Sequence, residues 1–407
     1  YNTNPTLLAA RADLRATDEN VPIQKSAGLP DIGAQGQYAE TLKVSENSFS
    51  APDRIFRTNV ELNVPIYSGG AVKNSIRAAK QRVQAGRADL RATEASIFSQ
   101  VVAAYMDVIR DEAVVGLNLQ NVDALSVNLE ATGDRFEIGD LTRTDVAQSE
   151  SRLAIARSDL TTAQANLIGS RERYVQLVGE VPTALEAPPP LPGLPDDPQT
   201  AVAIALESNP DLLAARERVQ AARYEIEVAG SGRLPRVSLF TAGDYTDYLG
   251  TLGDGIIGAD FAQRETSAQA GARFSIPIFQ GGLPAAQERQ AQARAASAFE
   301  TEIAIERDVI AQVRSAYTAW QASLEVIDST TSAVSAAQLS LEGVRAENSV
   351  GNRTILDILD AEQELLRAEV QLVTARRNAY VAGFSLLAAM GMAEAEDLNL
   401  DVGRPLY

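Results

Sequence analysis

The chain lacks the residue types on which most enzyme active sites depend. Its 407 residues include no His and no Cys, which excludes a Ser-His-Asp triad, a thiol nucleophile, a disulfide framework and a zinc site built on thiolates. The chemistry that remains open is that of carboxylates, Lys and Tyr. The clearest carboxylate pair is Asp357 and Asp360, which are three residues apart and would share one face of a helix.

The pair formed by Asp357 and Asp360 has two explanations. Acidic residues in the first turn of a helix stabilise it by about 0.3–1 kcal/mol each through the helix dipole. Alternatively, carboxylates that crowd one opening repel one another, which raises their pKa values and attracts cations. The residue spacing alone leaves both explanations open.

Charge and hydropathy limit the partners of the chain. With 36 basic and 54 acidic side chains, its formal net charge is −18, which argues against a nucleic-acid partner. No run of 18 apolar residues is present, so a membrane-spanning helix is not expected. Alternating strands that cross a membrane remain possible, because their sequence signal is weak. The chain opens at Tyr1 without a leader, so we expect any signal peptide to have been removed or left out of this sequence.

The second half of the chain repeats the first. Asn4-Pro5 returns as Asn209-Pro210, and VPIYSGG (64–70) returns as IPIFQGG (276–282). Internal repeats of this kind indicate one structural unit used twice.

The repeats predict three segments. We expect a first structural repeat over 1–180 and a second over 199–407. Between them, residues 181–198 hold seven of the 17 prolines and should form an extended linker, an equatorial strap. The final part of the second repeat is expected to be a C-terminal equatorial segment.

Long helices are predicted in both repeats. Residues 72–136 contain no proline, and their apolar residues recur every seven positions, which is typical of a coiled-coil seam. We expect helical hairpins at about 70–180 and about 282–392, preceded by a shorter helix in each repeat. Thr142 and Thr354 are predicted N-caps of the returning helices, since an Asp follows each of them three residues later.

Two segments per repeat have a period of two instead. The clearest are 58–67 and 268–279, with weaker partners at about 32–42 and 237–248. They predict β-hairpins at about 31–67 and about 236–279, with strands long enough to cross a bilayer. Four strands leave open edges, which lipid does not tolerate. Copies of the chain must therefore pair, and eight or twelve strands are both compatible with the spacing.

These features together resemble the TolC-like outer-membrane efflux proteins. The resemblance is carried by the two NP-x-L-x-x-A openings, the Leu-Pro before each first strand, and the Pro-Ile-(Tyr/Phe)-x-Gly-Gly joints. It is also carried by RFEIGDLTRTDVAQSES (135–151) and VGNRTILDILDAEQELLRAE (350–369). The likeness covers nearly the whole chain, in order and in both repeats.

The resemblance implies a mixed α and β membrane protein of the Gram-negative outer membrane and periplasm. It implies a homotrimer with a twelve-stranded β-barrel among outer-membrane lipid, four strands per protomer, continued by an α-helical barrel. The family is a passive exit duct of tripartite export systems, so we expect no catalytic residue, cofactor or metal. It carries proteins or small toxic molecules and docks to a periplasmic adaptor and an inner-membrane transporter. The absence of Cys disfavours the lipid-anchored multidrug subgroup and favours an ABC over an RND transporter.

The resemblance also implies the roles of particular residues at the helix tips, which would open like an iris. Asp357 and Asp360 map to an acidic ring across the pore entrance. Arg353 maps to a latch with Asp145, and Asn348 lies where the best-known member has a tyrosine of that latch. The tip residues expected to dock the adaptor are Ile138, Gly139, Asp140, Leu141, Thr142, Val350, Gly351, Asn352 and Thr354.

Two other classes of protein fit parts of the sequence. A non-channel coiled-coil structural or adaptor protein of the envelope would explain the heptads, but it would not need four alternating strands of bilayer length. A carboxylate-only enzyme, such as a glycosidase, would need a cleft and aromatic platforms, whereas aromatics make up 5% of the chain.

Overall fold

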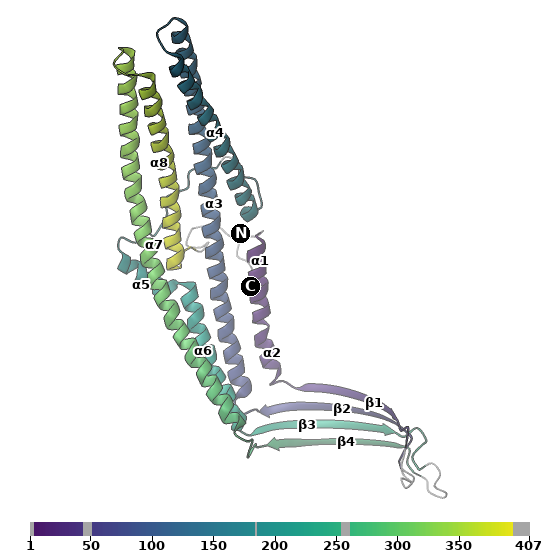
Figure 1. The fold of residues 1–407 in the computed structure, drawn as a ribbon. Helices are drawn as coiled ribbons and strands as arrows, with labels where there is room; N and C mark the ends of the chain where they lie inside the picture. The colour runs from purple at the N-terminus through teal and green to yellow at the C-terminus, as the bar shows by residue number, and fades with distance from the viewer. Residues whose placement is uncertain (1–3, 44–50, 184, 254–260, 394–407) are drawn as a thin grey trace. The chain divides into compact units, whose positions relative to one another are not determined.

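The computed structural model describes residues 4–43, 51–183, 185–253 and 261–393 (Figure 1). The first half of the chain contains α1 (Pro5–Asp18), α2 (Asn20–Ser26), β1 (Asp31–Glu40), β2 (Arg54–Tyr67), α3 (Ala71–Glu137) and α4 (Arg143–Val178). The second half contains α5 (Pro198–Ser208), α6 (Pro210–Gly230), a 3-10 turn (Ser231–Arg233), β3 (Arg236–Asp247), β4 (Arg264–Ser275), α7 (Leu283–Ser349) and α8 (Ile355–Met390).

The two halves repeat the same order of elements. Each has two shorter helices, two strands, a helix of 67 residues and a helix of 36 residues. The predicted fold class, with long antiparallel helices and four strands per chain, is therefore confirmed. The predicted C-terminal equatorial segment extends into residues 394–407, which lie outside the described residues.

Contacts divide the chain into two compact units, and each unit takes segments from both repeats. The first unit comprises Tyr1–Asp13, Arg87–Ala214 and Ile303–Tyr407, and the second comprises Leu14–Gly86 and Ala215–Glu302. The helix tips and the core between the hairpins belong to the first unit. The strands and the beginnings of α3 and α7 belong to the second.

The second unit contains one antiparallel sheet in the order β1-β2-β3-β4. Ile32 pairs with Leu62, Leu62 with Thr241, and Thr241 with Ala270. The chain order therefore equals the spatial order, which is what two consecutive hairpins produce. Strands β1 and β4 are the edges, and among the described residues neither has a second neighbour.

Three boundaries of the two clearest predicted strands are wrong. Strand β2 begins at Arg54 and β4 at Arg264, each four residues before the predicted start. The end of β4 differs for a clear reason. The alternating pattern predicted a strand up to Phe279, but β4 ends at Ser275. Pro277 has no backbone N–H, so it cannot donate to a strand ladder. The segment after Ser275 leaves the sheet, and Ile278 is 95% exposed within the chain.

The first unit has its largest core where α5, α6, α7 and α8 meet. Its fully buried side chains include Leu212, Val313, Leu386 and Met390.

The Asn of each NP-x-L motif makes a hydrogen bond from its side chain to a distant helix end. Asn209 Nδ2 donates to Ala389 O at 3.0 Å, and in the first repeat Asn4 Nδ2 donates to Leu177 O at 2.9 Å. The motif thus fastens the start of one helix to the end of the returning helix.

Tyrosine hydroxyls hold the Pro-rich linker on the helices. Tyr105 of α3 donates to Glu186 O at 2.6 Å, and Tyr317 of α7 donates to Asp196 O at 2.7 Å. Tyr380 of α8 donates to Pro189 O at 3.2 Å. Each bond satisfies a backbone carbonyl of a segment that has few partners of its own. The linker is therefore a fixed strap across three helices.

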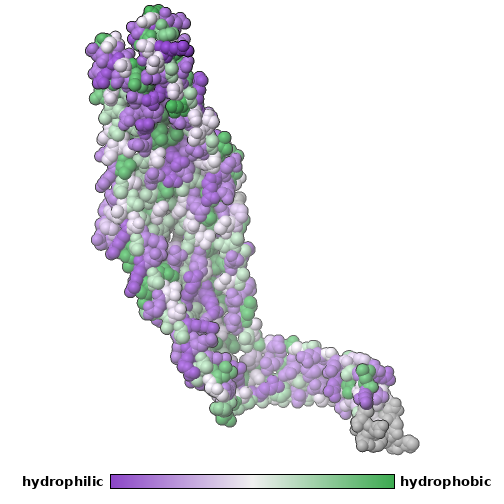
Figure 2. Space-filling model, viewed as in Figure 1, coloured by the Kyte–Doolittle hydropathy of each residue, from purple (hydrophilic) through white to green (hydrophobic). Residues whose placement is uncertain are grey.

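The long helices do not resemble membrane spans. Figure 2 shows hydrophilic and hydrophobic residues interspersed over the viewed face of the helices. Among the described residues, every helix is too short or too polar to cross a membrane.

Candidate functional site

The first helix tip joins α3 to α4 through a capping box. Thr142 N donates to Asp145 Oδ2 at 2.8 Å, and Asp145 N donates to Thr142 Oγ1 at 3.3 Å. Gly139 has a φ of +83°, a conformation that L side chains rarely adopt. Arg135 and Asp140 form an ion pair of 2.7 Å across the turn. The tip is thus a tight, polar reversal.

The second helix tip repeats this geometry between α7 and α8. Thr354 N donates to Asp357 Oδ2 at 2.8 Å, Asp357 N donates to Thr354 Oγ1 at 3.3 Å, and Gly351 also has a φ of +83°. Both predicted capping boxes are confirmed. Asn348 Nδ2 donates to Arg353 O at 2.7 Å, so this predicted latch residue closes its own turn.

The acidic cap residues ionise more readily than usual. A hydrogen bond from the Thr354 hydroxyl lowers the pKa of Asp357, and the Thr142 hydroxyl lowers the pKa of Asp145 in the same way. Because the pKa in the folded state is lowered, the cap stabilises the tip above the ordinary pKa of aspartate. That stabilisation is lost as the pH falls through the lowered value. Within one protomer the pKa of Asp357 is therefore lowered, whereas crowding of carboxylates in a closed ring would raise it.

The structure does not bring Arg353 and Asp145 together within one protomer. Arg353 Nε lies 2.7 Å from Glu347 Oε2, and Arg353 Nη1 lies 3.8 Å from Asp357 Oδ1. The hydrogen bond with Glu347 raises the pKa of Arg353. The carboxylate of Asp145 accepts hydrogen bonds from the backbone N–H and the hydroxyl of Thr142. A link between Arg353 and Asp145 stays a prediction for the assembled protein.

Asp360 connects the two helical hairpins. Its Oδ1 lies 2.5 Å from Nη2 of Arg152 on α4. Leu359, the preceding residue, is fully buried against Leu125 of α3 and Leu153 of α4. The start of α8 therefore packs on the first hairpin through one apolar and one charged contact.

Sequence reasoning missed a buried carboxylate one turn further along α8. Glu362 is 6% exposed, and Asn128 Nδ2 of α3 donates to both of its oxygens at 2.9 Å. Arg345 Nη2 of α7 lies 2.9 Å from Glu362 Oε1. We call Asn128, Arg345 and Glu362 the Glu362 clasp. A signal was present in the sequence, because Glu362 interrupts the apolar line of Leu359 and Leu366 on α8.

The remaining predicted tip residues form the exposed ends of the hairpins. Ile138 is 81% exposed and Val350 is 70% exposed, so each tip presents a strongly exposed apolar side chain. The others surround these two and are exposed or half-exposed: Gly139, Asp140, Leu141, Thr142, Gly351, Asn352 and Thr354.

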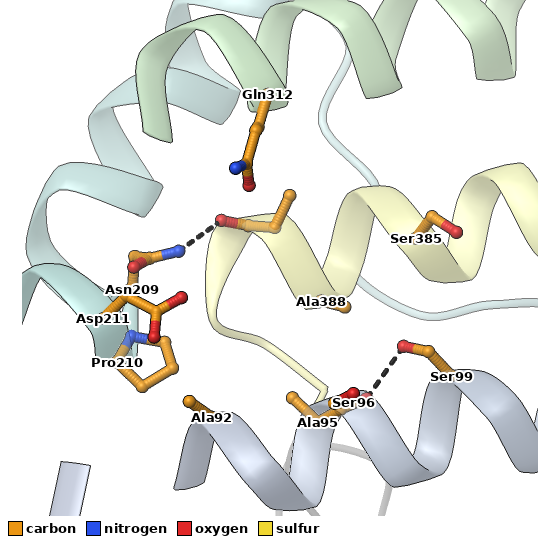
Figure 3. Close-up of a pocket in the computed structure, with 11 residues that line it drawn as sticks. Ala92, Ala95, Ser96, Ser99, Asn209, Pro210, Asp211, Gln312, Ser385 and Ala388 are labelled. Carbon is orange, nitrogen blue, oxygen red and sulfur yellow. Dashed lines mark hydrogen bonds between the residues drawn. The ribbon is translucent and has the colours of Figure 1, made fainter. Parts of the chain in front are cut away.

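A hollow of about 250 Å³ in the first unit does not look like a catalytic site. It lies among α3, α7, α8 and the start of α6, and small residues such as Ala92, Ala95 and Ser96 line it (Figure 3). Its clearest polar contact is the hydrogen bond from Asn209 to Ala389 O (Figure 3). In the part of the chain that the structure describes, no group of three Asp, Glu, His or Cys could hold a metal ion.

Comparison with known proteins identifies the family. The family model "Outer membrane efflux protein" matches residues 2–180 and 201–392. The chain is 34% identical to the outer membrane efflux protein BepC of Brucella suis, over 99% of this chain and 86% of BepC. It is 28% identical to the outer membrane protein TolC of Escherichia coli, over 97% of this chain and 81% of TolC.

A solved structure has the same fold. The outer membrane protein VceC of Vibrio cholerae superposes with a TM-score of 0.80 at 23% identity, covering 96% of this chain and 93% of VceC. These matches favour a channel over a coiled-coil structural or adaptor protein and over a carboxylate enzyme. The chain belongs to the outer membrane efflux protein family, and it is a non-enzymatic efflux channel protein of the Gram-negative outer membrane that extends into the periplasm.

Proposed function

We propose that three copies of this chain form the exit duct of a tripartite export system. The observation that carries the proposal is the four-stranded sheet with two open edges, β1 and β4. Unpaired N–H and C=O groups are not tolerated in lipid, so each edge requires a strand from another copy. Closure by three copies gives a twelve-stranded barrel. The experiment is native mass spectrometry of the detergent-solubilised protein: three times the chain mass of 43.4 kDa supports the barrel, and two times contradicts it.

The pore entrance in this proposal is a ring of carboxylates at the second tips. Asp357 and Asp360 lie at the start of α8, and both are solvent-accessible within one protomer. Three protomers would bring six carboxylates to one opening, where their field attracts cations. Arg152 partly neutralises each Asp360, so Asp357 is expected to contribute more of the field.

Removing these charges tests the ring. We expect Asp357→Asn with Asp360→Asn to lower the cation-to-anion permeability ratio and to weaken block by divalent cations about tenfold. The measurement is the reversal potential and the block of single channels in planar bilayers. Asp159→Asn, an exposed carboxylate on α4, is the control and should leave both unchanged. Wild-type selectivity in the double variant would place the constriction elsewhere.

The resting state in this proposal is held closed by a latch and by the Glu362 clasp. Arg353 and Asp145 are on different tips, so their pairing would tie neighbouring hairpins across the closed entrance. The Glu362 clasp joins α3, α7 and α8 inside one protomer. An iris-like movement of the second hairpin relative to the first would have to break it.

Loss of the Arg353 charge tests the latch. We expect Arg353→Ser to increase resting conductance several-fold, because each exposed ion pair is weak but three latches act together. Arg143→Ser, which removes an exposed arginine from the first tip, is the control. Resting conductance at the wild-type level in Arg353→Ser would show that this residue only closes its own turn through Glu347.

The helix tips are proposed to dock a periplasmic adaptor. Ile138 and Val350 are exposed apolar side chains at tips that also carry polar residues, the combination expected of a small contact site. We propose an ABC transporter as the inner-membrane partner. Crosslinking followed by purification through this chain tests both: recovery of an adaptor with an ABC transporter supports the proposal, and recovery with an RND transporter contradicts its second part.

A further inference from the structure

The beginning of α3 is unusually basic for this chain. Residues 71–87 contain Lys73, Arg77, Lys80, Arg82 and Arg87 and no Asp or Glu, although the chain has a net charge of −18. All four lysines of the chain lie between positions 25 and 80. This segment therefore carries a local positive charge within an acidic chain.

Three of these cations share one face of the helix. Lys73, Arg77 and Lys80 follow a spacing of i, i+4 and i+7, which places them along one line on an α-helix, and all three are exposed. We call them the α3 stripe. At about 1.5 Å per residue, the stripe is about 10 Å long.

The α3 stripe has no carboxylate partner among the residues that the structure describes. In contrast to Arg82, which forms an ion pair with Glu225, neither lysine has an ion pair among the described residues. The guanidinium of Arg77 lies 5.6 Å from the centre of the Tyr224 ring, a contact that leaves its charge unneutralised. The stripe thus presents three uncompensated positive charges to the solvent.

Helix formation does not explain these charges. Lys73 lies in the first turn of α3, where the positive end of the helix dipole disfavours cations. The second repeat shows that the fold does not need the two lysines, because the matching positions in α7 are Ala285 and Gln292, whereas Arg289 matches Arg77. Helix formation therefore leaves Lys73 and Lys80 unexplained, and a ligand outside the chain would account for both.

The position of the α3 stripe points to that ligand. Strand β2 ends at Tyr67, and α3 begins at Ala71 in the same compact unit. Ile66 and Tyr67 are 59% and 48% exposed. An apolar residue and an amphipathic aromatic at a strand end are typical of the membrane–water boundary. Long cationic side chains just beyond that boundary reach lipid headgroups.

We propose that the α3 stripe binds the phosphate groups of anionic phospholipids in the periplasmic leaflet of the outer membrane. The inference rests on the membrane barrel of the proposed function. Each cation near an anionic membrane surface contributes about a five-fold preference. Lys73 and Arg77, which are nearer to the strand end, are expected to contribute more than Lys80.

The test compares lipid binding by the purified trimer. Phosphatidylglycerol and phosphatidylcholine are titrated separately, and bound lipids are counted by native mass spectrometry. The wild-type protein should prefer phosphatidylglycerol at least about tenfold, and the variant K73Q/R77Q/K80Q should bind both lipids nearly equally. The matched control R157Q/R307Q/R314Q removes three exposed arginines outside the second unit and should retain the preference.

A wild-type preference for phosphatidylglycerol in K73Q/R77Q/K80Q would overturn the inference. If the same variant also showed a shifted reversal potential in planar bilayers, the stripe would instead belong to the water-filled path of anionic cargo. Failure of the wild-type protein to form trimers would instead contradict the proposed function.

Discussion

Replacing Glu362 with glutamine is expected to raise the open fraction of the channel at least about tenfold. Glu362 is buried and accepts two hydrogen bonds from Asn128 and one from Arg345. Hydrogen bonds to a charged group contribute about 1.5–3 kcal/mol to the state in which they form. A loss of that size confined to the closed state corresponds to roughly a 10- to 150-fold shift toward the open state.

Glutamine is the informative replacement because it keeps the shape of the side chain. Its amide group offers one acceptor oxygen in place of two, and its NH₂ would face the NH₂ of Asn128. Two donors then meet in a buried position, which costs more than the loss of a solvent-exposed pair. Arg345 is 53% exposed in its side chain, so water can solvate it once the clasp opens.

Single-channel recording in planar bilayers measures this effect. Glu364→Gln makes the same chemical change two residues further along α8 at an exposed position, and it should leave the resting conductance unchanged. If Glu362→Gln lowers the melting temperature while its resting conductance equals that of the wild type, the clasp has a structural role only.

Replacing Gly391 with alanine is expected to destabilise the protein by about 3 kcal/mol or more. Gly391 ends α8 with a φ of +79°, which costs an L side chain about 1–2 kcal/mol. An added Cβ would also lie 2.4 Å from Ser208 O. Because the contact is with backbone, the junction of α5 and α6 would have to move. That movement would disturb the hydrogen bond from Asn209 to Ala389 O.

The repeat supplies a matched control for Gly391. Gly179 ends α4 at the equivalent position with a φ of +90°, but a Cβ there would have no neighbour within 4 Å. Gly179→Ala should therefore cost only the backbone strain of about 1 kcal/mol. Thermal unfolding followed by circular dichroism should give a clearly lower melting temperature for Gly391→Ala than for Gly179→Ala. Equal decreases would show that the backbone near Ser208 adapts without cost.

The elements of the fold could be predicted because each depends on local periodicity. In the sequence of α3 apolar residues recur every seven positions, and in the sequence of β2 they recur every two. Thr142 and Thr354 were predictable as caps, since a capping box involves residues only three positions apart. The end of β4 was mispredicted because the apolar alternation continues past Pro277, whereas the backbone hydrogen bonds do not.

The contacts of the candidate site were harder to predict because they join distant segments. Asn128 and Glu362 are 234 residues apart, and Arg152 and Asp360 are 208 apart. Local patterns do not specify which helix faces meet. Arg353 is an example, since the three acidic residues Glu347, Asp357 and Asp145 all lie at the tips and could each form an ion pair with it. Sequence spacing does not show which of them is the partner, whereas the geometry of one protomer favours Glu347.

The tyrosine contacts of the Pro-rich strap have a consequence for sequence divergence. Tyr105, Tyr317 and Tyr380 donate to backbone carbonyl oxygens of the strap and not to its side chains. Every amino acid supplies such an oxygen, so the residues at 186, 189 and 196 can be exchanged without removing an acceptor. Relatives can therefore accumulate mutations at these positions, and the three tyrosine hydroxyls would still hold the strap in the same place.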